Sequence, residues 1–220
     1  MNVPHIKVCI KNFRVPLFFA ANVVRSAVLC ALFCSAFYTL LCTTSCASMQ
    51  TPKRIFVYVT DVKKVYLLPP SAVEHSVSTM QLFEGTFSDA KKTSMTFIAS
   101  TDCTEQKISV VMMNELGIEI ASLLYSESEL SLHSAFLPDG IKPEYVIMDF
   151  QNVYYSSVLL DAAYKAAGLS FTMTELDGVE HRFIKDGDVV VEMIEKKDGC
   201  ITLHNYIRGY TYRLTELADE

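Results

Sequence analysis

The 220-residue sequence contains no tryptophan, and no acidic residue occurs before Asp61. The lack of tryptophan excludes a binding site lined by that residue. Four lysines and arginines within the first 25 residues carry the only formal side-chain charges before residue 50, and the stretch from Ser26 to Gln50 carries none. A basic start followed by an apolar run is the pattern of an export signal.

The apolar run ends in Thr43-Thr44-Ser45 directly before Cys46. Bacterial lipoprotein signals end in this way, although Thr43 stands where leucine is usual, and the cysteine is acylated to become the first mature residue. The sequence therefore predicts a signal peptide at 1–45, lipidation at Cys46 and a tether at 46–53. Two alternatives stay open. The run is long enough for an uncleaved anchor helix, and an ordinary cleaved signal peptide has similar features.

The part of the chain after Cys46 is acidic. It contains all 25 acidic residues but only 15 of the 19 basic ones, so its net charge is near −10. Such a surface repels phosphate backbones, and we expect no nucleic-acid partner. It does not bind anionic lipid by charge either, so membrane attachment depends on the lipid anchor or the helix.

Cysteine is scarce in this part, because only Cys103 and Cys200 follow Cys46. Two cysteines so far apart in sequence neither establish nor exclude a disulfide. No cysteine–histidine spacing is typical of a zinc site, and we expect neither a metal nor a cofactor.

Residues 54–220 have the size of one domain. Short alternating segments separated by polar turns predict two antiparallel meanders, one on each side of a longer segment without such turns. No strand–helix alternation occurs, which argues against a parallel sheet. The expected strands are Arg54–Thr60, Val62–Leu68, Val77–Phe87, Thr93–Ala99, Lys107–Met113, Ile118–Tyr125, Glu129–Ala135, Leu169–Glu175, His181–Lys185, Asp188–Lys196, Cys200–Ile207 and Tyr210–Leu217.

The segment between the meanders, residues 144–167, contains no glycine or proline and has apolar residues at helical spacing. We expect one or two helices with a break near Tyr155-Ser156, ended by Gly168. A sheet of about ten strands curls strongly. The predicted fold is therefore mainly β (α+β): a strongly curved antiparallel sheet, or half-open β-barrel, with an inserted helical lid. The lid residues expected to face the sheet are Val146, Phe150, Val153 and Val158.

Several short motifs occur in a fixed order between about residues 83 and 216. They are Phe83-Glu84-Gly85, Leu116-Gly117, the nine residues from Leu137 to Tyr145, Met148-Asp149-Phe150-Gln151, Leu203-His204-Asn205-Tyr206, Gly209-Tyr210 and Arg213-Leu214. In this order the motifs resemble the bacterial lipoprotein family called domain of unknown function 3261. The chain departs from that family at Tyr155-Ser156, where a tryptophan–proline pair is usual.

The resemblance implies the fold of the LolA/LolB group, whose members carry and receive lipoproteins for the outer membrane. It thus implies a lipid-anchored protein of the bacterial cell envelope, at the outer membrane and facing the periplasm. The ligand expected from it is a lipid, an acyl chain or a lipoprotein, held in an apolar concave cavity. An envelope protein is a further candidate partner.

A concave apolar face has the capacity for this function, since burial of each methylene contributes about 0.8 kcal/mol. Methionine recurs among the inward positions and adapts to different ligands. The expected lining residues are Met95, Phe97, Ile108, Val110, Met112, Ile118, Ile120, Leu130, Leu132, Phe171, Met173, Val191, Met193, Ile201 and Leu203. The same alternation is typical of a filled β core. A docking lipoprotein of an envelope assembly, with no ligand, therefore stays open as the alternative.

Catalytic signatures are missing from the sequence. It has no Gly-x-Ser-x-Gly elbow, no His-Glu-x-x-His helix and no glycine-rich phosphate loop. Asp149 and Asp161 are twelve residues apart, so they do not form a carboxylate pair on one helical turn. We expect Asp149 to be solvated or to cap a helix, and we expect a protein that is not an enzyme.

Overall fold

The computed structural model describes residues 54–88, 93–134 and 142–217. The predicted signal peptide, Cys46 and the tether lie outside these residues, as does the motif segment 137–141. Residues Pro52–Glu220 form one compact unit. Among the described residues, no helix has both the length and the apolar character that crossing a bilayer requires.

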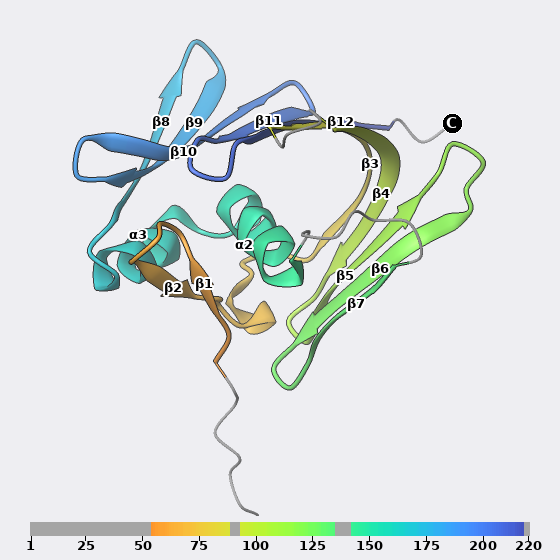
Figure 1. The fold of residues 1–220 in the computed structure, drawn as a ribbon, viewed down its shortest axis with the longest axis horizontal. Helices are drawn as coiled ribbons and strands as arrows, with labels where there is room; N and C mark the ends of the chain where they lie inside the picture. Colours follow the sequence, from red (N-terminus) through yellow and green to blue (C-terminus); the bar gives the residue numbers. More distant parts are fainter. Residues whose placement is uncertain (1–53, 89–92, 135–141, 218–220) are drawn as a thin grey trace, which may run out of the picture. The chain divides into compact units, whose positions relative to one another are not determined.

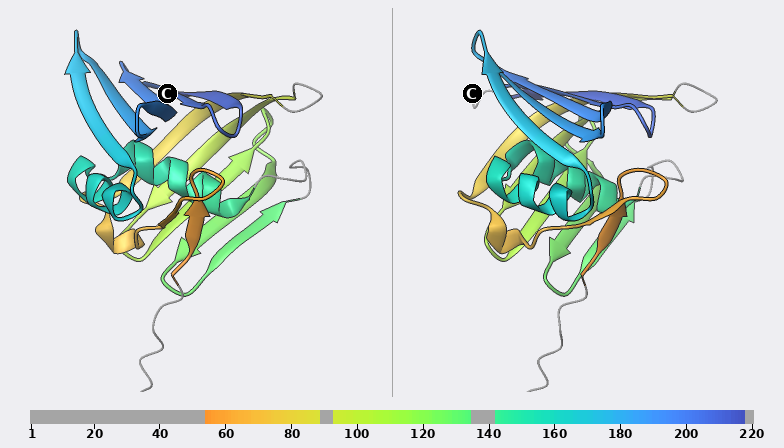
Figure 2. Two further views of the ribbon diagram at one scale, coloured as in Figure 1. Left: turned by 60° about the vertical axis from the view of Figure 1, so that its left-hand side comes forward. Right: turned by 90° about the vertical axis from the view of Figure 1, so that its left-hand side faces the viewer.

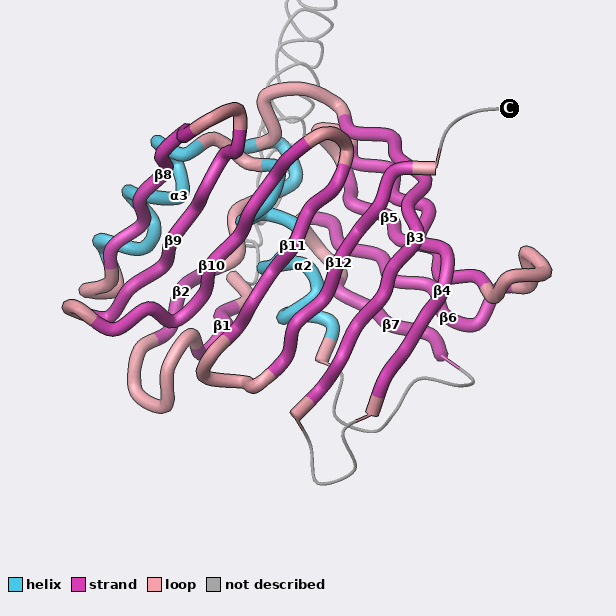
Figure 3. The backbone as a smooth tube through the Cα atoms, turned by 90° about the horizontal axis from the view of Figure 1, so that it is seen from above, coloured by secondary structure: helices cyan, strands magenta, loops and turns pink. Residues whose placement is uncertain are grey.

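Ten strands form one antiparallel sheet (Figure 1). In chain order they are β3 (Val77–Phe87), β4 (Ser94–Cys103), β5 (Lys107–Met113), β6 (Glu119–Ser126), β7 (Leu130–Ser134), β8 (Ser170–Leu176), β9 (Val179–Asp186), β10 (Val189–Lys197), β11 (Cys200–Asn205) and β12 (Tyr210–Glu216). Their order across the sheet is β7-β6-β5-β4-β3-β12-β11-β10-β9-β8. Two five-stranded meanders thus meet where β3 pairs with β12, and Figure 3 shows the strands side by side in front of the helices.

Two helices and a small hairpin lie on the concave side of the sheet (Figure 2). The helices are α2 (Pro143–Tyr154) and α3 (Ser157–Ala166), and the break between them falls at the predicted position. Strands β1 (Phe56–Tyr58) and β2 (Lys64–Tyr66) pair only with each other, and a 3-10 turn, η1 (Pro70–Ala72), follows them. The sheet does not close, because β7 and β8 are its edges within the described residues. The predicted fold class is confirmed.

Local chemistry sets the ends of the helical segment. Pro143 is the first residue of α2, where its missing N–H costs no helical hydrogen bond. The segment ends at Gly168, whose φ of 72° lies in the left-handed region that glycine adopts without a Cβ penalty. The N–H of Leu169 then donates to the carbonyl of Tyr164, which turns the chain into β8.

A β-bulge in β10 changes which side chains face inward. The register of β10 against β9 shifts between Val190 and Glu192, so that Val191 and Glu192 are both buried. Strict alternation resumes after the bulge and leaves Met193 opposite Phe183, on the outer face. The expectation that Met193 faces the concave side is therefore wrong, because the sequence pattern contains no signal for the bulge.

The packing of α2 against the sheet predicts a clear contrast between two substitutions. Ile147 on α2 has no exposed surface, whereas Val158 on α3 is 74% exposed. We expect Ile147→Ala to lower the free energy of unfolding by about 2–5 kcal/mol, through lost burial and a new cavity. Val158→Ala should change it by less than about 0.5 kcal/mol.

Urea denaturation of the full-length protein measures both values. Similar effects of the two variants would contradict the observed position of α2 within the core.

Candidate functional site

The concave face has two chemically different halves. The half formed by β4 to β7 is apolar, and its buried side chains belong to one cluster with apolar side chains of α2. The contact between α2 and this half of the sheet is therefore apolar packing, which is non-directional. The cluster includes Phe97, Ile108, Val110, Met112 and Leu123 of the sheet, together with Ile147, Met148 and Phe150 of α2.

The other half, formed by β8 to β12, places charged groups among its inward apolar residues. Directly paired residues of an antiparallel sheet share a face, and Glu192 pairs with Asn205 while Glu180 pairs with Lys196. Arg182 is opposite Ile194, which is completely buried. A charged inward half contradicts the expectation of a concave face that is apolar throughout.

A buried hydrogen-bonded network joins α2 and α3 to this charged half; we call it the polar clamp and define it by Asp149, Asn152, Tyr164, Glu192, Asn205 and Tyr210. The Nδ2 of Asn152 donates to Glu192 Oε1 at 2.8 Å, and the Nδ2 of Asn205 donates to Oε2 at 2.7 Å. The Tyr164 hydroxyl donates to Asn152 Oδ1 at 2.8 Å. Each polar atom of the Asn152 amide and of the Glu192 carboxylate that faces the network thus has a partner.

The remaining pair of the polar clamp joins α2 directly to β12. The Tyr210 hydroxyl lies 3.0 Å and 2.8 Å from the two carboxylate oxygens of Asp149. Asp149 is only 6% exposed, so the expectation of a solvated or capping residue is wrong. The helical spacing that places Phe150 and Val153 in the core also turns Asp149 inward.

The C-terminal end of α2 is held by cations of the sheet. The Nη1 of Arg182 donates to the carbonyls of Asn152 and Tyr155 at 2.8 and 2.9 Å, and the Nζ of Lys196 donates to the carbonyl of Val153 at 3.2 Å. These carbonyls have no partner within the helix, and positive charge is favourable at this end. Glu180 lies within 2.7 Å of Arg182 and 3.0 Å of Lys196, so it orients both cations.

Gln151 fixes the middle of α2 to the chain after β2. Its Nε2 donates to the carbonyl of Leu68 at 2.6 Å, and its Oε1 accepts from the Leu68 N–H at 3.1 Å. The hydroxyl of Tyr125 donates to the same carbonyl at 3.0 Å, and that of Tyr155 donates to the Pro69 carbonyl at 3.3 Å. The helix is therefore bonded on two sides while its apolar side packs against β4 to β7.

Burial raises the pKa values of both carboxyl groups in the polar clamp. Burial, and then the neighbouring Glu192, raise the pKa of Asp149 well above its usual value. Burial also raises the pKa of Glu192, but the amides of Asn152 and Asn205 oppose this by stabilising the carboxylate. The amide N–H groups at Glu192 can only donate, whereas the Tyr210 hydroxyl can also accept from a protonated Asp149. We therefore assign the negative charge to Glu192 and a proton to Asp149.

Arg208 supplies the balancing positive charge. Burial lowers its pKa, but Tyr210, Asp149 and Glu192 outweigh this effect and raise the pKa overall. Its guanidinium stacks 3.7 Å from the centre of the Tyr145 ring at the start of α2, and its Nη2 donates to the carbonyl of Tyr58. The half-buried cation thus lowers the cost of the buried carboxylate through its charge, although the two groups form no direct ion pair among the described contacts.

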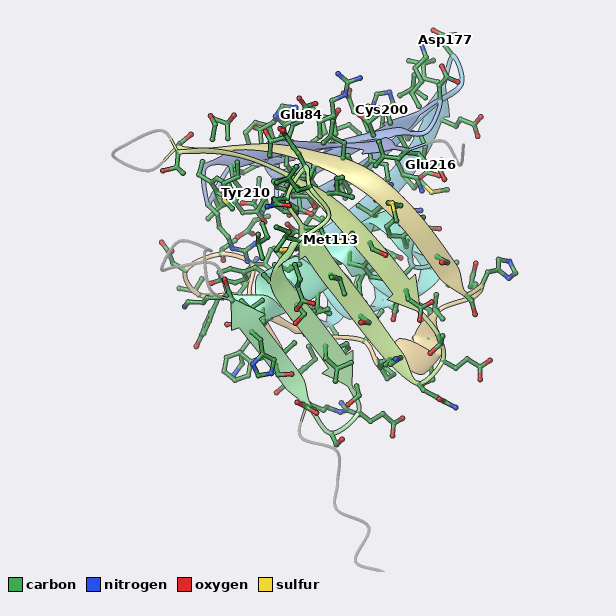
Figure 4. The ribbon with its side chains drawn as sticks, turned by 90° about the vertical axis from the view of Figure 1, so that its right-hand side faces the viewer. Glu84, Met113, Asp177, Cys200, Tyr210 and Glu216 are labelled. Atoms are coloured by element: carbon green, nitrogen blue, oxygen red, sulfur yellow. The ribbon has the colours of Figure 1, made fainter. Side chains whose placement is uncertain are left out.

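The space around α2 is unevenly filled. A cavity of only about 10 Å³ lies between α2, α3 and β2, where Met148 and Leu160 are among its lining residues. A solvent-open hollow of about 480 Å³ lies beyond the C-terminal end of α2 and is bordered by Tyr154, Glu180 and Lys196. Figure 4 shows Cys200 and Glu216, which also border the hollow, at one end of the sheet, whereas Tyr210 lies toward the other end.

The structure places most of the predicted lining residues in or against the core. Eight are buried: Phe97, Ile108, Val110, Met112, Phe171, Val191, Ile201 and Leu203. Four are partly buried against the core: Met95, Ile120, Leu130 and Leu132. Ile118 is exposed in the turn before β6, and Met173 is exposed because β8 is an edge strand.

The predicted lid residues divide in a similar way. Phe150 and Val153 are buried, and Val146 packs partly buried against the core. Val158 is exposed, because the chain changes direction at Tyr155 and α3 turns this position outward.

The polar clamp was not anticipated from the sequence, although several of its members lie within the motifs quoted above. Asp149 belongs to Met148–Gln151, Asn205 to Leu203–Tyr206, and Tyr210 follows Gly209. Glu192 and Asn152 lie outside those motifs. The one sequence signal for Glu192 is its place as a charged residue inside a strongly apolar run. A charged side chain buried at such a position needs hydrogen-bond partners.

The cysteines and histidines of the described residues offer little reactive chemistry. Cys103 and Cys200 are both free thiols. Burial raises the pKa of Cys103 to about 11, which keeps the thiol protonated and weakens it as a nucleophile. The ring of His204 is bonded to Thr211 through Nδ1 at 2.9 Å. Within the described ranges no three His, Cys, Asp or Glu side chains gather in a way that suits a metal ion.

The raised pKa of Asp149 predicts a specific pH dependence of stability. The folded protein holds this proton more tightly than the unfolded chain, whose carboxyl titrates near 3.8. The resulting stabilisation is fully present below that value and is lost as the pH rises through the folded pKa. We expect Asp149→Asn, which cannot ionise, to gain stability relative to the wild type with rising pH, by up to about 1.4 kcal/mol per pH unit.

Chemical denaturation of the full-length protein between about pH 4 and pH 8 measures this difference. Asp161→Asn is the matched control, because Asp161 lies on the exposed side of α3 and pairs with Lys165 at 2.7 Å. Its effect should stay below about 0.5 kcal/mol. A constant difference between Asp149→Asn and the wild type over the whole range would refute the protonated carboxyl.

Comparison with known proteins agrees with the resemblance noted above in one respect. A family model described as "Protein of unknown function (DUF3261)" matches residues 78–218, which include all ten strands of the large sheet except Val77. No curated protein matches the sequence.

Proposed function

We propose that this chain, which belongs to the DUF3261 family, is a membrane-anchored lipoprotein of the bacterial envelope that binds an acyl chain on its concave face. The ligand is a lipid or the acyl chain of another lipoprotein. Helix α2 acts as the lid, and the ligand takes the place of α2 on the apolar half of the sheet. The role is non-catalytic and needs no cofactor.

The asymmetric attachment of α2 carries this proposal. Its C-terminal end is bonded to Arg182, Lys196 and Glu192, and these bonds fix position and direction. Toward β4 to β7 the same helix is held in one apolar cluster. Apolar contacts are non-directional, so an acyl chain replaces them without leaving a polar group unpaired. The helix therefore has a fixed end and a side that an amphiphile can displace.

Burial free energies indicate which acyl chains are long enough to displace α2. Removing Ile147, Met148 and Phe150 from the core costs about 1.5–3 kcal/mol each, or about 5–9 kcal/mol in total. Each buried methylene returns about 0.8 kcal/mol, so about 6–11 methylenes offset the loss. Chains of about sixteen carbons exceed this whole range, whereas chains of about eight carbons lie at its lower end. The hollow beyond Tyr154 accommodates a polar head beside Glu180 and Lys196.

Membrane attachment is the second part of the proposal. The basic start, the uncharged run and Cys46 support a lipid anchor, with residues 46–53 as the tether. The resemblance to the LolA/LolB group supports the outer membrane, facing the periplasm. The negative charge after Cys46 makes a nucleic-acid partner unfavourable.

A docking lipoprotein without a ligand is the second candidate. The packing of α2 into one buried cluster with β4 to β7 favours it, because α2 already covers the apolar half of the sheet in this arrangement. In that case α2 is a permanent part of the core, and an envelope protein is the partner. The two candidates differ in one respect, which is whether α2 leaves the sheet.

The lack of tryptophan allows a direct test. Phe97→Trp places a single fluorophore on the inward face of β4, and Phe183→Trp places one on the outward face of β9. Full-length protein in nanodiscs is titrated with brominated hexadecanoic acid, which quenches tryptophan on contact. We expect several-fold stronger quenching of the inward fluorophore than of the outward one, and weaker quenching by brominated octanoic acid.

Equal quenching at both positions would show that the acid only partitions into the bilayer nearby, and it would contradict a concave binding site. No quenching of the inward fluorophore, in a variant that unfolds as the wild type does, would favour the docking lipoprotein.

A further inference from the structure

The β1–β2 hairpin exposes three aromatic side chains on one face. Phe56 is 42% exposed, and Tyr58 and Tyr66 are each 47% exposed. Val57 and Val65 alternate with them and are buried on the opposite face. Because alternate residues of a strand point to opposite faces, burial of the two valines turns the aromatic rings away from the core.

These side chains form an ordered surface rather than isolated exposed residues. The Phe56 ring makes edge contacts with the rings of Tyr58 and Tyr66, at centroid distances of 5.5 and 6.4 Å. The Nζ of Lys64 lies 4.4 Å from the centre of the Phe56 ring. Lys64 is directly opposite Tyr58, so the cation belongs to the same face. We call these four residues the aromatic face.

The hairpin that carries the aromatic face is tied firmly to the domain. The Nζ of Lys63 lies 2.6 Å from the Asp186 carboxylate, and it also donates to the Gly168 carbonyl at 2.7 Å. Arg208 donates to the carbonyl of Tyr58. These bonds join the hairpin to α3, β9 and the turn before β12, so the orientation of the face is set by the fold.

We propose that the aromatic face rests on the lipid bilayer to which the chain is anchored. This inference depends on the membrane attachment proposed above. The proposed anchor is at Cys46, and Phe56 follows it by ten positions along the chain. A fully extended chain spans at most about 3.6 Å per residue, so Phe56 lies within about 36 Å of the anchor. Among the residues that the structure describes, no other exposed aromatic side chain is so close to Cys46 along the chain.

The chemistry of the aromatic face suits the interfacial layer of a bilayer. Tyrosine rings concentrate at the level of the lipid head groups, where the ring is buried and the hydroxyl remains hydrated. Lys64 lies where it meets lipid phosphates, with its stem along the Phe56 ring. The remaining surface is acidic and has no electrostatic attraction to anionic lipid. Contact through aromatic rings therefore decides which side of the domain faces the membrane.

Single-tryptophan variants test this contact. Phe56→Trp and Tyr66→Trp each place a fluorophore on the aromatic face, and Leu176→Trp places one at an exposed position at the end of β8, away from the hairpin. The full-length chain is reconstituted into phosphatidylcholine vesicles whose acyl chains are brominated near the head group. We expect the two fluorophores of the aromatic face to be quenched several-fold more than the control.

Vesicle flotation of the same samples separates the two proposals. A chain that floats with its vesicles, but whose aromatic face is quenched no more than the control, would overturn the membrane contact and leave the anchor intact. A chain that does not float would overturn both. Shielding of the aromatic face in native membranes, without quenching in pure lipid vesicles, would assign the face to a protein partner and overturn the lipid contact.

Discussion

The structure depends most on the way in which the carboxylate of Glu192 is buried. Only 1% of this residue is exposed, and both of its oxygens accept hydrogen bonds from asparagine amides, one on α2 and one on β11. A carboxylate without partners at this position would cost several kcal/mol. The position of α2 is therefore specified by the requirement that Asn152 meets Glu192, whereas apolar packing alone tolerates many positions.

The same constraint explains the division of the concave face. Charged and hydrogen-bonded groups on β8 to β12 fix the C-terminal end of α2, and the apolar residues of β4 to β7 cover its other side. A core that was apolar throughout would hold the helix with less directional preference. In the proposed carrier, the polar clamp keeps the lid attached and in register while the apolar contacts are exchanged for a ligand.

Much of the fold follows from patterns within the sequence. Each of the twelve predicted strands overlaps an observed one, because alternation and turn residues are local signals, and the break at Tyr155 was also predictable. The candidate site is harder to predict from the sequence. The bulge between Val190 and Glu192 reverses the faces of the residues after it, so alternation alone predicts Met193 on the inner face and Glu192 on the outer one. The pairing of Asp149 with Tyr210 joins residues 61 positions apart and has no local signal.

Hydrogen exchange along α2 shows whether a ligand displaces the helix, because it reports where the helix leaves the sheet. A helix of 12 residues is marginal in water once its packing is lost, so displacement exposes its amides. With saturating hexadecanoic acid, we expect faster exchange along α2, with the smallest change at residues 152–155, where Arg182 and Lys196 hold the carbonyls. Unchanged exchange along the whole of α2 in the presence of the bound acid would contradict the account.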